Sequence, residues 1–544
     1  MFVIIVGISS ILYFFSANYD SRIKIENNLL GINSKNDNFL CDSTFKTGYT
    51  TANTPSDNIE NSYLTQTYDV IVIGAGISGL EAAHQLDKNG VNVMILEGRD
   101  RIGGRVWTVD IDNTAIDLGA SWIHGLNQYS GFQNPLFLIT ERNNIITVKT
   151  SDTSTLYNYI GKKIDDDTSE IFDRYVKFAQ KYDETLTDEQ KQKISVQDVI
   201  NKFYLKGSLD ARQRAIFNYT MQFNYDMGQA ENTTNISFAK SLETQYFAED
   251  EDHEVIFPQG YGQIANCLAG KLNILHANVT KVDYTGSPIT IYTNQGIFHA
   301  THVISTLPIS ILQNKTNMKV EFVPNFDQTK MDAINSLAMG TMDKVYLLYD
   351  KPFWDSSTWI NRVSENNNVT DKKWQFFFNL YKYDDKPIIL AFNTGESAKQ
   401  LEMKSNYEIK NELVNILEKI YPGKHEPINY VVTRWASDPL AGGSYSIVPI
   451  NGSVNSADIL AKPINDKLFF AGEATSKYYY GTVHAAYISG YRAAEEVLKA
   501  KDEKLLDAPL EQLRHGIKKW DVICKANEQL IVDESSDDNM VYKK

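Results

Sequence analysis

The feature that most restricts the fold is an ordered series of short segments that begins at residue 68. An apolar, β-branched run, Tyr68–Ile73, leads into a glycine turn, G-A-G-I-S-G at 74–79, which is followed by a helix-forming stretch. A second apolar run, Val91–Leu96, ends at an acid, Glu97. Strand, glycine turn, helix, strand and acid occur in this order in Rossmann units, where the acid accepts hydrogen bonds from a ribose hydroxyl. The series therefore predicts a dinucleotide-binding unit.

The turn residues have separate roles in such a unit. Gly74 permits the tight turn, Gly76 lets the backbone approach a pyrophosphate, and Gly79 lets the helix pack on the strand. Ile77 and Ser78 lie at the helix N-terminus, where free N–H groups and the positive end of the helix dipole attract phosphate. Glycine turns alone are common, so it is the surrounding strand, helix and acid that favour dinucleotide binding.

The segment directly after the acid decides between NAD and FAD. Residues 98–106, G-R-D-R-I-G-G-R-V, contain three arginines, whose planar donor groups match phosphate oxygens. The segment resembles the E-x-R-x-R-x-G-G-R pattern of the FAD-dependent amine oxidase family. This resemblance implies an α/β fold, with a Rossmann-like FAD-binding domain on a parallel sheet and an inserted α+β substrate-binding domain. Its cofactor-binding residues here are Gly98, Arg99, Gly104 and Arg105.

A second match to the family lies at residues 115–125, A-I-D-L-G-A-S-W-I-H-G. Taken alone, this pattern is a strand followed by a buried loop with a hydrogen-bonded histidine. It closely resembles the D-L-G-A-S-W-I-H-G loop of polyamine oxidases, which passes the reactive face of the flavin; monoamine and L-amino-acid oxidases differ at the Trp and His positions. The resemblance implies that His124 faces the substrate, where it can bond an amine or tune its protonation. The cofactor contacts that it implies are Gly119, Ala120, Ser121 and Trp122.

Lys344 lies in an alternating apolar stretch, residues 340–349, where an ammonium group must be paired, solvated or neutral. A solvent-facing lysine on an edge strand would also explain the pattern. The stretch resembles the family strand whose lysine holds a water at flavin N5. On that resemblance, Lys344 is expected to order this water and to assist the reoxidation of the flavin.

The C-terminal part contains three more matches, at residues 433–446, 468–475 and 481–494. The last is a loop that enters an alanine-rich helix. The N-terminus of this helix, at Thr482 and Val483, can face the flavin pyrimidine and stabilise its reduced anion. The resemblance further implies an adenine contact through the Val279 backbone, and a ribityl or pyrophosphate contact at Glu473. The cofactor-binding residues that complete the set are Val279, Trp435, Gly472 and Glu473.

Two positions depart from the monoamine oxidase pattern. There, a cysteine at the position of Ser444 links covalently to FAD; serine cannot form this thioether, so we expect non-covalent FAD. Two tyrosines at the positions of Tyr445 and Thr482 enclose the amine in those enzymes. Only one aromatic residue remains here, so a longer or bulkier amine is expected to contact Tyr445 and Thr482.

At 544 residues, the chain is too long for one typical core, and we expect two large domains. The expected FAD-binding domain is assembled from residues 65–150, 255–310 and 434–500. The expected substrate domain is assembled from residues 151–254 and 311–433.

The two ends differ in composition from the rest of the chain. Residues 1–17 are almost wholly apolar and are interpreted as a signal peptide or a membrane anchor, which favours the secretory pathway, with a secreted, lumenal or N-terminally anchored product. Residues 18–64 are interpreted as a polar linker and residues 501–544 as a charged tail. The three cysteines form no metal pattern, and we expect no metal and no essential disulfide.

The formal charge of −15 argues against nucleic-acid binding and is compatible with a cationic substrate. An acidic run at residues 249–254 is interpreted as a solvated loop that could steer polycations toward a site. Nothing in the residues indicates an oligomeric state.

The resemblance implies an enzyme that oxidises a C–N bond. Hydride passes from the carbon beside a neutral amine to the flavin, the imine hydrolyses, and oxygen becomes hydrogen peroxide. A polyamine of the spermine or spermidine class is the expected substrate. An L-amino-acid oxidase, which would need an arginine for the substrate carboxylate, a monoamine oxidase and a non-catalytic FAD-binding protein are the alternatives. The apolar N-terminus and the absence of nuclear signals disfavour a histone demethylase.

Overall fold

The computed structural model describes residues 66–126, 134–165, 169–207, 209–239, 254–364, 373–477 and 479–501. The expected signal peptide or anchor, the linker, residues 249–253 of the acidic run and nearly all of the charged tail lie outside these residues. Within the described part of the chain, no helix is long and apolar enough to cross a membrane. We expected no essential disulfide, and the structure differs from this expectation, because Cys267 is disulfide-bonded.

An eight-stranded sheet forms the framework of one domain. Its strands are β1 (Thr67–Ile73), β2 (Val93–Glu97), β10 (Ile274–His276), β11 (Val279–Asp283), β12 (Ile289–Thr293), β13 (Gly296–Ser305), β14 (Glu321–Val323) and β22 (Leu468–Phe470). The order is β10-β2-β1-β13-β12-β11-β14, and β22 also pairs with β13. The ladders among β10, β2, β1, β13 and β22 are parallel, whereas β12 is antiparallel to both of its neighbours. The predicted fold class is confirmed.

The central strand β1 is buried on both faces, which explains its uninterrupted apolar run. Val70 and Val72 pack on one side in a core with the helices α4 (Ile77–Lys88), α5 (Pro135–Arg142), α11 (Gly262–Ala269) and α18 (Val483–Ala500). Ile71 and Ile73 pack on the other side. The elements of that second layer are α12 (Ile309–Leu312), α13 (Gln328–Asn335), α17 (Asn455–Ala461) and the 3₁₀ turn η3 (Glu473–Thr475).

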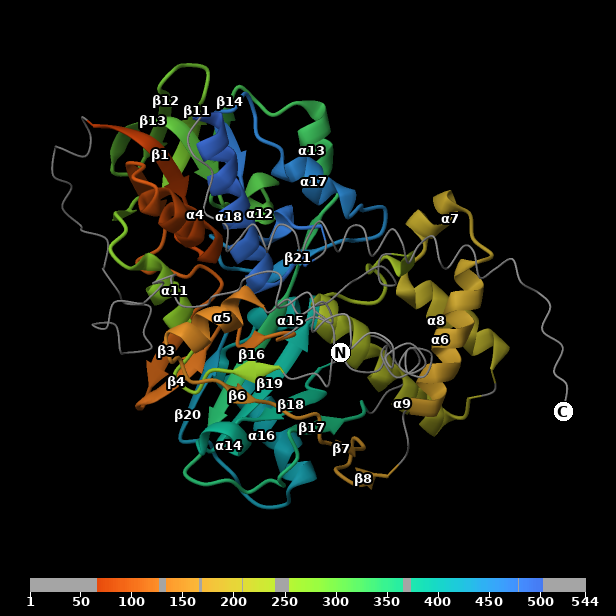
Figure 1. Cartoon of the computed structure of the whole chain (residues 1–544). Coiled ribbons are helices and arrows are strands. Elements are labelled where there is room, and N and C mark those ends of the chain that lie inside the picture. Colours follow the sequence, from red (N-terminus) through yellow and green to blue (C-terminus); the bar gives the residue numbers. More distant parts are fainter. Residues whose placement is uncertain are drawn as a thin grey trace, which may run out of the picture.

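The helices α4 and α18 lie side by side over the parallel part of the sheet (Figure 1). They approach so closely at Gly490 that a Cβ there would lie 2.1 Å from the carbonyl oxygen of Ser78. The hydroxyl groups of Ser78 and Ser489 are 3.1 Å apart at the same crossing. Glycine at 490 is therefore required by the close contact between the two backbones.

The second domain contains a seven-stranded sheet. Its strands are β7 (Ser154–Tyr157), β8 (Lys163–Ile164), β16 (Met342–Leu348), β17 (Trp359–Arg362), β18 (Phe376–Asn379), β19 (Ile388–Thr394) and β20 (Asn429–Val432). The order is β20-β16-β19-β18-β17-β7-β8, with antiparallel ladders except between β17 and β7. One face packs against α15 (Gly395–Glu402) and α16 (Asn406–Ile420), and α14 (Tyr381–Asp384) connects β18 to β19.

A helical group completes this domain and lies beside the sheet, at the right of Figure 1. It contains α6 (Ser169–Asp183), α7 (Asp188–Lys193), α8 (Val196–Lys206), α9 (Ala211–Met221) and the π-helix η2 (Gln222–Met227). Aromatic and aliphatic residues of α6, α8 and α9 form a core of their own. Capping boxes begin α7, α8 and α9, because each has an oxygen-bearing N-cap side chain and a polar side chain three residues on.

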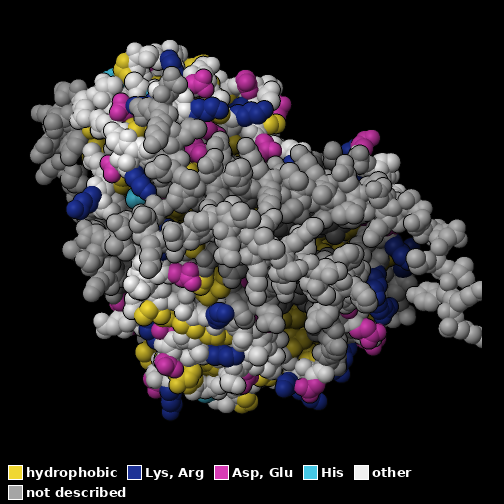
Figure 2. All heavy atoms as spheres, in the orientation of Figure 1, with side chains coloured by type: hydrophobic (Ala, Val, Ile, Leu, Met, Phe, Trp, Pro, Cys, Tyr) yellow, Lys and Arg dark blue, Asp and Glu magenta, His cyan; other side chains and the backbone are white. Residues whose placement is uncertain are grey.

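Short strands connect the larger units: β3 (Thr108–Ile111), β4 (Thr114–Asp117), β5 (Trp122–Ile123), β6 (Val148–Lys149), β9 (Val255–Ile256), β15 (Ala338–Gly340) and β21 (Tyr445–Ile447). The ladder of β15 with β21 brings the chain before β16 against the segment after Ser444. Two elements depart from the expected ranges. Both β14 and α13 lie within 311–433, yet β14 pairs in parallel with β11 of the first sheet and α13 packs on that sheet. On the described surface visible in Figure 2, acidic and basic side chains are interspersed.

Candidate active site

A cavity of about 550 Å³ extends from the glycine turn after β1 to the second sheet. All predicted site residues line it except Gly79, which lies behind the wall. The predicted residues in the wall are Gly74, Gly76, Ile77, Ser78, Glu97, Gly98, Arg99, Gly104, Arg105, Gly119, Ala120, Ser121, Trp122, His124, Val279, Lys344, Trp435, Tyr445, Gly472, Glu473, Thr482 and Val483. Matches dispersed over the chain therefore meet at one place.

The glycine turn closes one end of the cavity. A Cβ at Gly79 would lie 1.9 Å from the carbonyl oxygen of Gly74, whose φ is +102°, so strand and helix can meet only through glycine at position 79. At Gly76, by contrast, a Cβ would find no protein atom within 4 Å. Gly76 is the N-cap of α4, and no side chain caps this helix. The space beside Gly76 and the uncapped N–H groups fit a phosphate.

Glu97 is buried at the end of β2, and both of its oxygens are positioned by backbone donors. Oε2 accepts from the Ala75 N–H at 2.6 Å, and Oε1 accepts from the Arg99 N–H at 2.7 Å. Each carboxylate oxygen has a second lone pair, which leaves it able to accept from a ribose hydroxyl. Burial raises the pKa of Glu97, although the two N–H donors oppose the effect.

The two arginines in the cavity wall are each held by a carboxylate. Arg99 forms a bidentate pair with Asp438, at 2.9 and 2.8 Å. Arg105 donates to Glu473 at 2.8 Å and to the Ser444 carbonyl at 3.2 Å. Arg101 does not line the cavity, and its guanidinium lies 4.2 Å from the ring centre of Trp107.

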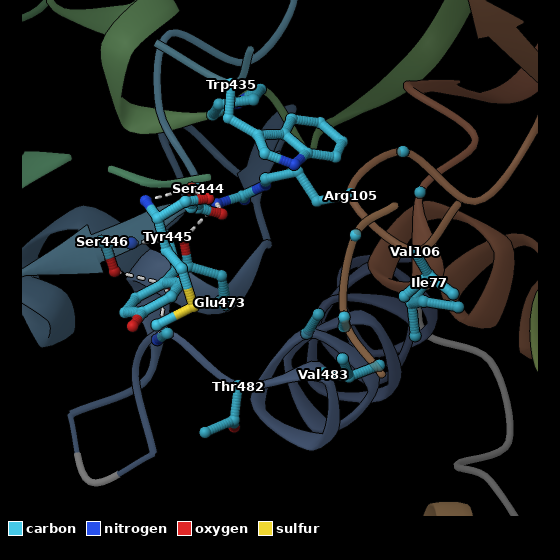
Figure 3. A pocket seen from close by; sticks show the side chains of 18 of the residues that line it. Ile77, Arg105, Val106, Trp435, Ser444, Tyr445, Ser446, Glu473, Thr482 and Val483 are labelled. Carbon is cyan, nitrogen blue, oxygen red and sulfur yellow. Dashed lines mark hydrogen bonds and ion pairs between the residues drawn. The ribbon is translucent and has the colours of Figure 1, made fainter. Parts of the chain in front are cut away.

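Glu473 joins three distant segments around the cavity (Figure 3). Besides Arg105, it accepts from the Gly481 N–H at 2.7 Å, from the Ser446 N–H at 3.1 Å and from the Ser446 hydroxyl. The carboxylate thus fixes the start of β21 and the loop before α18 relative to Arg105. Its predicted contact with the ribityl chain or the pyrophosphate stays a prediction.

Lys344 lies on β16, between β19 and β20, and is therefore not on an edge strand. Its side chain is buried, and Nζ donates to the Gly119 carbonyl and to the Ser121 hydroxyl, both at 2.5 Å. A longer contact, at 3.3 Å, reaches the carbonyl of Asp117. Burial lowers the pKa of Lys344 to about 8, with Asp117 opposing the effect. The ammonium is thus poised to change its protonation near neutral pH.

His124 forms a pair that the sequence did not predict. Its Nδ1 lies 2.6 Å from Oε1 of Glu254, and both residues line the cavity. Burial alone would lower the pKa of His124, but the carboxylate outweighs burial and raises it. Burial alone would raise the pKa of Glu254, and the histidine likewise reverses the shift. The acidic run contained Glu254, but only the antiparallel pairing of β5 with β9 brings it to His124.

Aromatic rings form the wall beside Lys344. The Trp122 ring centre lies 5.5 Å from Nζ of Lys344 and 5.1 Å from the ring of Phe378. Phe378 is 5.0 Å from Trp359, which in turn is 5.6 Å from Phe223 of η2. These rings line the cavity and provide an apolar surface that leads away from Lys344.

Tyr445 lies across the view from Ile77 and Val106, and Thr482 and Val483 lie next to each other below them (Figure 3). The Tyr445 hydroxyl donates to the Met227 carbonyl at 3.1 Å. Thr482 is the N-cap of α18, and its hydroxyl accepts from the Ala485 N–H. The helix N-terminus therefore does open into the cavity, as the sequence predicted, although Thr482 itself supplies one cap.

The residues present fit FAD. An uncapped helix N-terminus with open space at Gly76, an acid with free lone pairs and two arginines lie at one end of the cavity. The loop with Gly119 and Ser121, the Trp435 ring and the N-terminus of α18 surround its middle. Trp435 is oriented by donation from Nε1 to the Leu118 carbonyl, at 3.0 Å. Within the described ranges, no group of acidic, histidine or cysteine side chains could hold a metal ion.

Residues 77–498 match the sequence model of a family described as flavin containing amine oxidoreductase. The chain is 31% identical over 457 residues to polyamine oxidase 2 of Arabidopsis thaliana, covering 79% of this chain and 88% of that protein. It is 29% identical over 452 residues to lysine-specific histone demethylase 1 homolog 2 of Oryza sativa subsp. japonica, covering 80% of this chain. It spans only 58% of that relative's length.

Among solved structures, putrescine oxidase bound to putrescine has the same fold, with a TM-score of 0.64 at 21% identity, over 80% of this chain and 99% of that one. At this low identity, the structural likeness establishes the fold alone. The sequence matches also establish the family, because one of them covers most of both chains. This protein belongs to the flavin-containing amine oxidoreductase family.

Proposed function

We propose that this protein is a FAD-dependent oxidase that converts a polyamine of the spermine or spermidine class to an imine and produces hydrogen peroxide. The supporting observation is the distribution of charge along the cavity. Arg99 and Arg105 lie at the expected phosphate end, and each is paired with a carboxylate. Toward the second sheet, the acidic residues Asp152 and Glu254 line the wall. A cavity with this polarity suits a cationic substrate.

The same distribution disfavours an amino acid as substrate. A substrate carboxylate would need a cationic partner, for which an arginine fork is best suited. In the wall formed by described residues, the arginines are Arg99 and Arg105, and both belong to the phosphate end. The remaining basic residues in this wall are His124, His484 and Lys344, and the protons of Lys344 already point to Gly119 and Ser121.

Bound FAD would accept the hydride and pass the electrons to oxygen. The protein's own residues would bind and orient the amine and adjust its protonation. Below the raised pKa of His124, the His124–Glu254 pair is neutral overall; above it, the pair carries one negative charge. This change favours binding of an ammonium group as the pH rises. Lys344, with a pKa of about 8, can hold or release a proton beside the loop at Gly119.

The decisive test is an anaerobic visible spectrum of the purified protein before and after addition of spermine. Bleaching of the flavin bands, followed by peroxide on admission of air, is the expected result. Bleaching by benzylamine, L-lysine or a methyl-lysine peptide, with none by spermine, would contradict the polyamine proposal while leaving an amine oxidase. Methyl-lysine is included because demethylase homologues are among the relatives. A folded flavoprotein that none of these amines reduces would contradict an amine oxidase altogether.

We also propose that the FAD is bound without a covalent link. The Ser444 hydroxyl donates to the Met342 carbonyl at 2.9 Å and accepts from the Met342 N–H at 2.8 Å. The side chain at this position is therefore engaged with β16 and offers no thiol. Acid precipitation should release the flavin into the supernatant. Yellow colour that stays with the precipitate would contradict this proposal.

The third proposal concerns location. The apolar residues 1–17 support entry into the secretory pathway, with the product secreted, lumenal or held by an N-terminal tether. Fusion of residues 1–64 to a reporter should direct it into the pathway, and N-terminal sequencing of the mature protein should decide between cleavage and a tether. A reporter that remains in the cytosol would contradict the proposal.

A further inference from the structure

A buried asparagine in the cavity wall has an acceptor without a donor. Asn361 lies on β17, is 1% exposed and lines the cavity. Its Nδ2 donates to the Tyr219 hydroxyl at 2.8 Å, whereas its Oδ1 accepts no hydrogen bond from the described residues. An unsatisfied buried acceptor is unfavourable and uncommon in folded proteins. The position is therefore suited to a donor that comes from a ligand.

A second acceptor of the same kind lies on the π-helix η2. Oδ1 of Asn224 is buried and without a hydrogen-bond donor in the described structure, and the residue lines the same cavity. Its Nδ2 donates to the Thr220 carbonyl at 2.8 Å. If the Asn224 amide were rotated by half a turn, its oxygen would face the Thr220 carbonyl oxygen, and both are acceptors. The contact with Thr220 therefore fixes which atom of the amide is Oδ1. The part of the cavity wall that η2 forms thus also contains an amide oxygen without a donor.

The register of the second sheet gives the distance of Asn361 from Lys344. Lys344 is paired with Phe392, Phe392 with Phe376, and Phe376 with Asn361. Residues paired directly across a ladder point to the same face. With neighbouring strands 4.7–4.9 Å apart, the two ends of this row are about 14 Å apart. Phe392 and Phe376 stand between the two polar positions, and the rings of Phe378 and Trp359 lie in the neighbouring row of the same face.

The cavity wall on the side of β7 also contains a carboxylate. Trp359, two residues before Asn361, is paired with Ser154 of β7. Ser154 and Asp152, two positions earlier in the chain, both line the cavity. A cavity wall that combines this negative charge with two amide oxygens favours a ligand group that is both a hydrogen-bond donor and a cation. An ammonium group has these properties.

We propose that Asn361 and Asn224 form a remote amine subsite, which binds a second ammonium group of the substrate while the reacting amine lies near Lys344. This inference rests on the proposed function and deepens it. In an extended chain, each single bond advances about 1.2 Å, so a span of about 14 Å corresponds to about twelve bonds. A tetraamine of spermine length reaches this far, with its methylene groups against the aromatic wall, whereas a short diamine does not. The subsite therefore selects substrates by the position of the distal amine.

The test compares two substrates in the full-length holoenzyme: spermine, and N-butylpropylamine, which has a reacting nitrogen but no distal one. Asn361→Leu removes the acceptor at similar volume. The ratio of kcat/KM for spermine to that for N-butylpropylamine should fall about tenfold, mainly through the KM for spermine. Asn361→Asp keeps an acceptor and adds a charge, and should raise the ratio. Asn379→Leu is the matched control, because Asn379 is buried on β18 and does not line the cavity.

The outcomes separate this inference from the proposed function. An unchanged ratio in folded, flavin-loaded Asn361→Leu would overturn the subsite, as would equal losses on both amines. If the leucine variant does not fold, an Asn361→Asp ratio no higher than that of the wild type would overturn it. If the wild type binds spermine without oxidising it, the proposed function fails. The subsite is then tested by calorimetry, from the ratio of the two amines' Kd values in the wild type and in the variants. Failure to bind spermine at all overturns both.

Discussion

Glu254 and His124 form a pair at 2.6 Å although 130 residues separate them in the chain. The pair lies in the cavity wall, and each partner shifts the pKa of the other toward the charged form against the effect of burial. In the folded protein it acts as one titrating unit.

Replacing Glu254 with Gln should lower the pKa of His124, because the carboxylate is what raises it. The acidic limb of the pH profile of kcat/KM should move to lower pH, and the KM for spermine should rise. Steady-state kinetics between pH 5 and 9 measures both. Glu321→Gln, which removes an exposed carboxylate of β14, serves as the control for net charge. An unchanged acidic limb would show that His124 does not control the profile.

The same pair makes a pH-dependent contribution to stability. A raised pKa of His124 stabilises the fold below its ordinary value of 6.5, and this contribution is lost as the pH rises through the folded value. A lowered pKa of Glu254 stabilises the fold above 4.5, and its contribution is lost on acidification through the folded value. Both contributions are therefore fully present between pH 4.5 and pH 6.5. The destabilisation by His124→Ala, measured by denaturant unfolding, should be largest in this range. A destabilisation that does not vary with pH would contradict this.

Lys344→Met should leave FAD bound and slow its reoxidation. The reason is that the buried ammonium beside Gly119 and Ser121 is the group expected to order water and supply a proton during the oxygen reaction. Stopped-flow mixing of the reduced protein with oxygen should show a rate at least about tenfold lower. In the wild type, this rate should change with pH around 8, the pKa of Lys344. Oxygen kinetics equal to those of the wild type would remove Lys344 from this role.

Two glycines of the same turn should respond differently to alanine. At Gly76 the added methyl group meets no protein atom, so the fold should tolerate it, while the phosphate of FAD loses space. At Gly79 the methyl group would lie 1.9 Å from a backbone oxygen, so the fold itself should be destabilised. Flavin titration and thermal unfolding of flavin-free protein distinguish the two effects. Equal losses of melting temperature would contradict the contrast.

Glu81 provides a test of burial on α4. Burial raises its pKa from 4.5 to about 8, against hydrogen bonds from Gln85 and Tyr487. A carboxyl group with a raised folded pKa loses stability as the pH rises from its unfolded to its folded value. Glu81→Gln should therefore stabilise the protein at pH 8 relative to the wild type, with a smaller gain at pH 5. Denaturant unfolding at the two pH values is the measurement, and a larger gain at pH 5 would contradict it.

The sequence predicted features that short segments encode by themselves. The apolar run of β1, the glycine turn and α4 depend on residues close in the chain, as does the loop from Gly119 to His124. Family resemblance then placed dispersed segments around one cofactor, and they do meet in one cavity. Both kinds of information concern local patterns.

Long-range pairing determined what the sequence could not predict. Asn361 looks like any polar residue of a strand until the register of four strands places it in line with Lys344. Glu254 is one acid among several until β9 pairs with β5. Residues 321–323 fell within the range expected for the substrate domain, 311–433, yet as β14 they complete the first sheet beside β11. These pairings depend on distant segments that no local pattern encodes.

The contact of Ser78 with Ser489 has a consequence for the order of synthesis. The two residues are 411 positions apart, and α4, which begins the expected cofactor site, packs on α18, which is made last among the described elements. A ribosome adds residues at about 5–20 per second, so α18 is synthesised tens of seconds after α4. Until then, the apolar face of α4, including Leu80 and Ala83, lacks the cover that α18 provides. Stable loading of the cofactor therefore has to follow nearly complete translation of the chain.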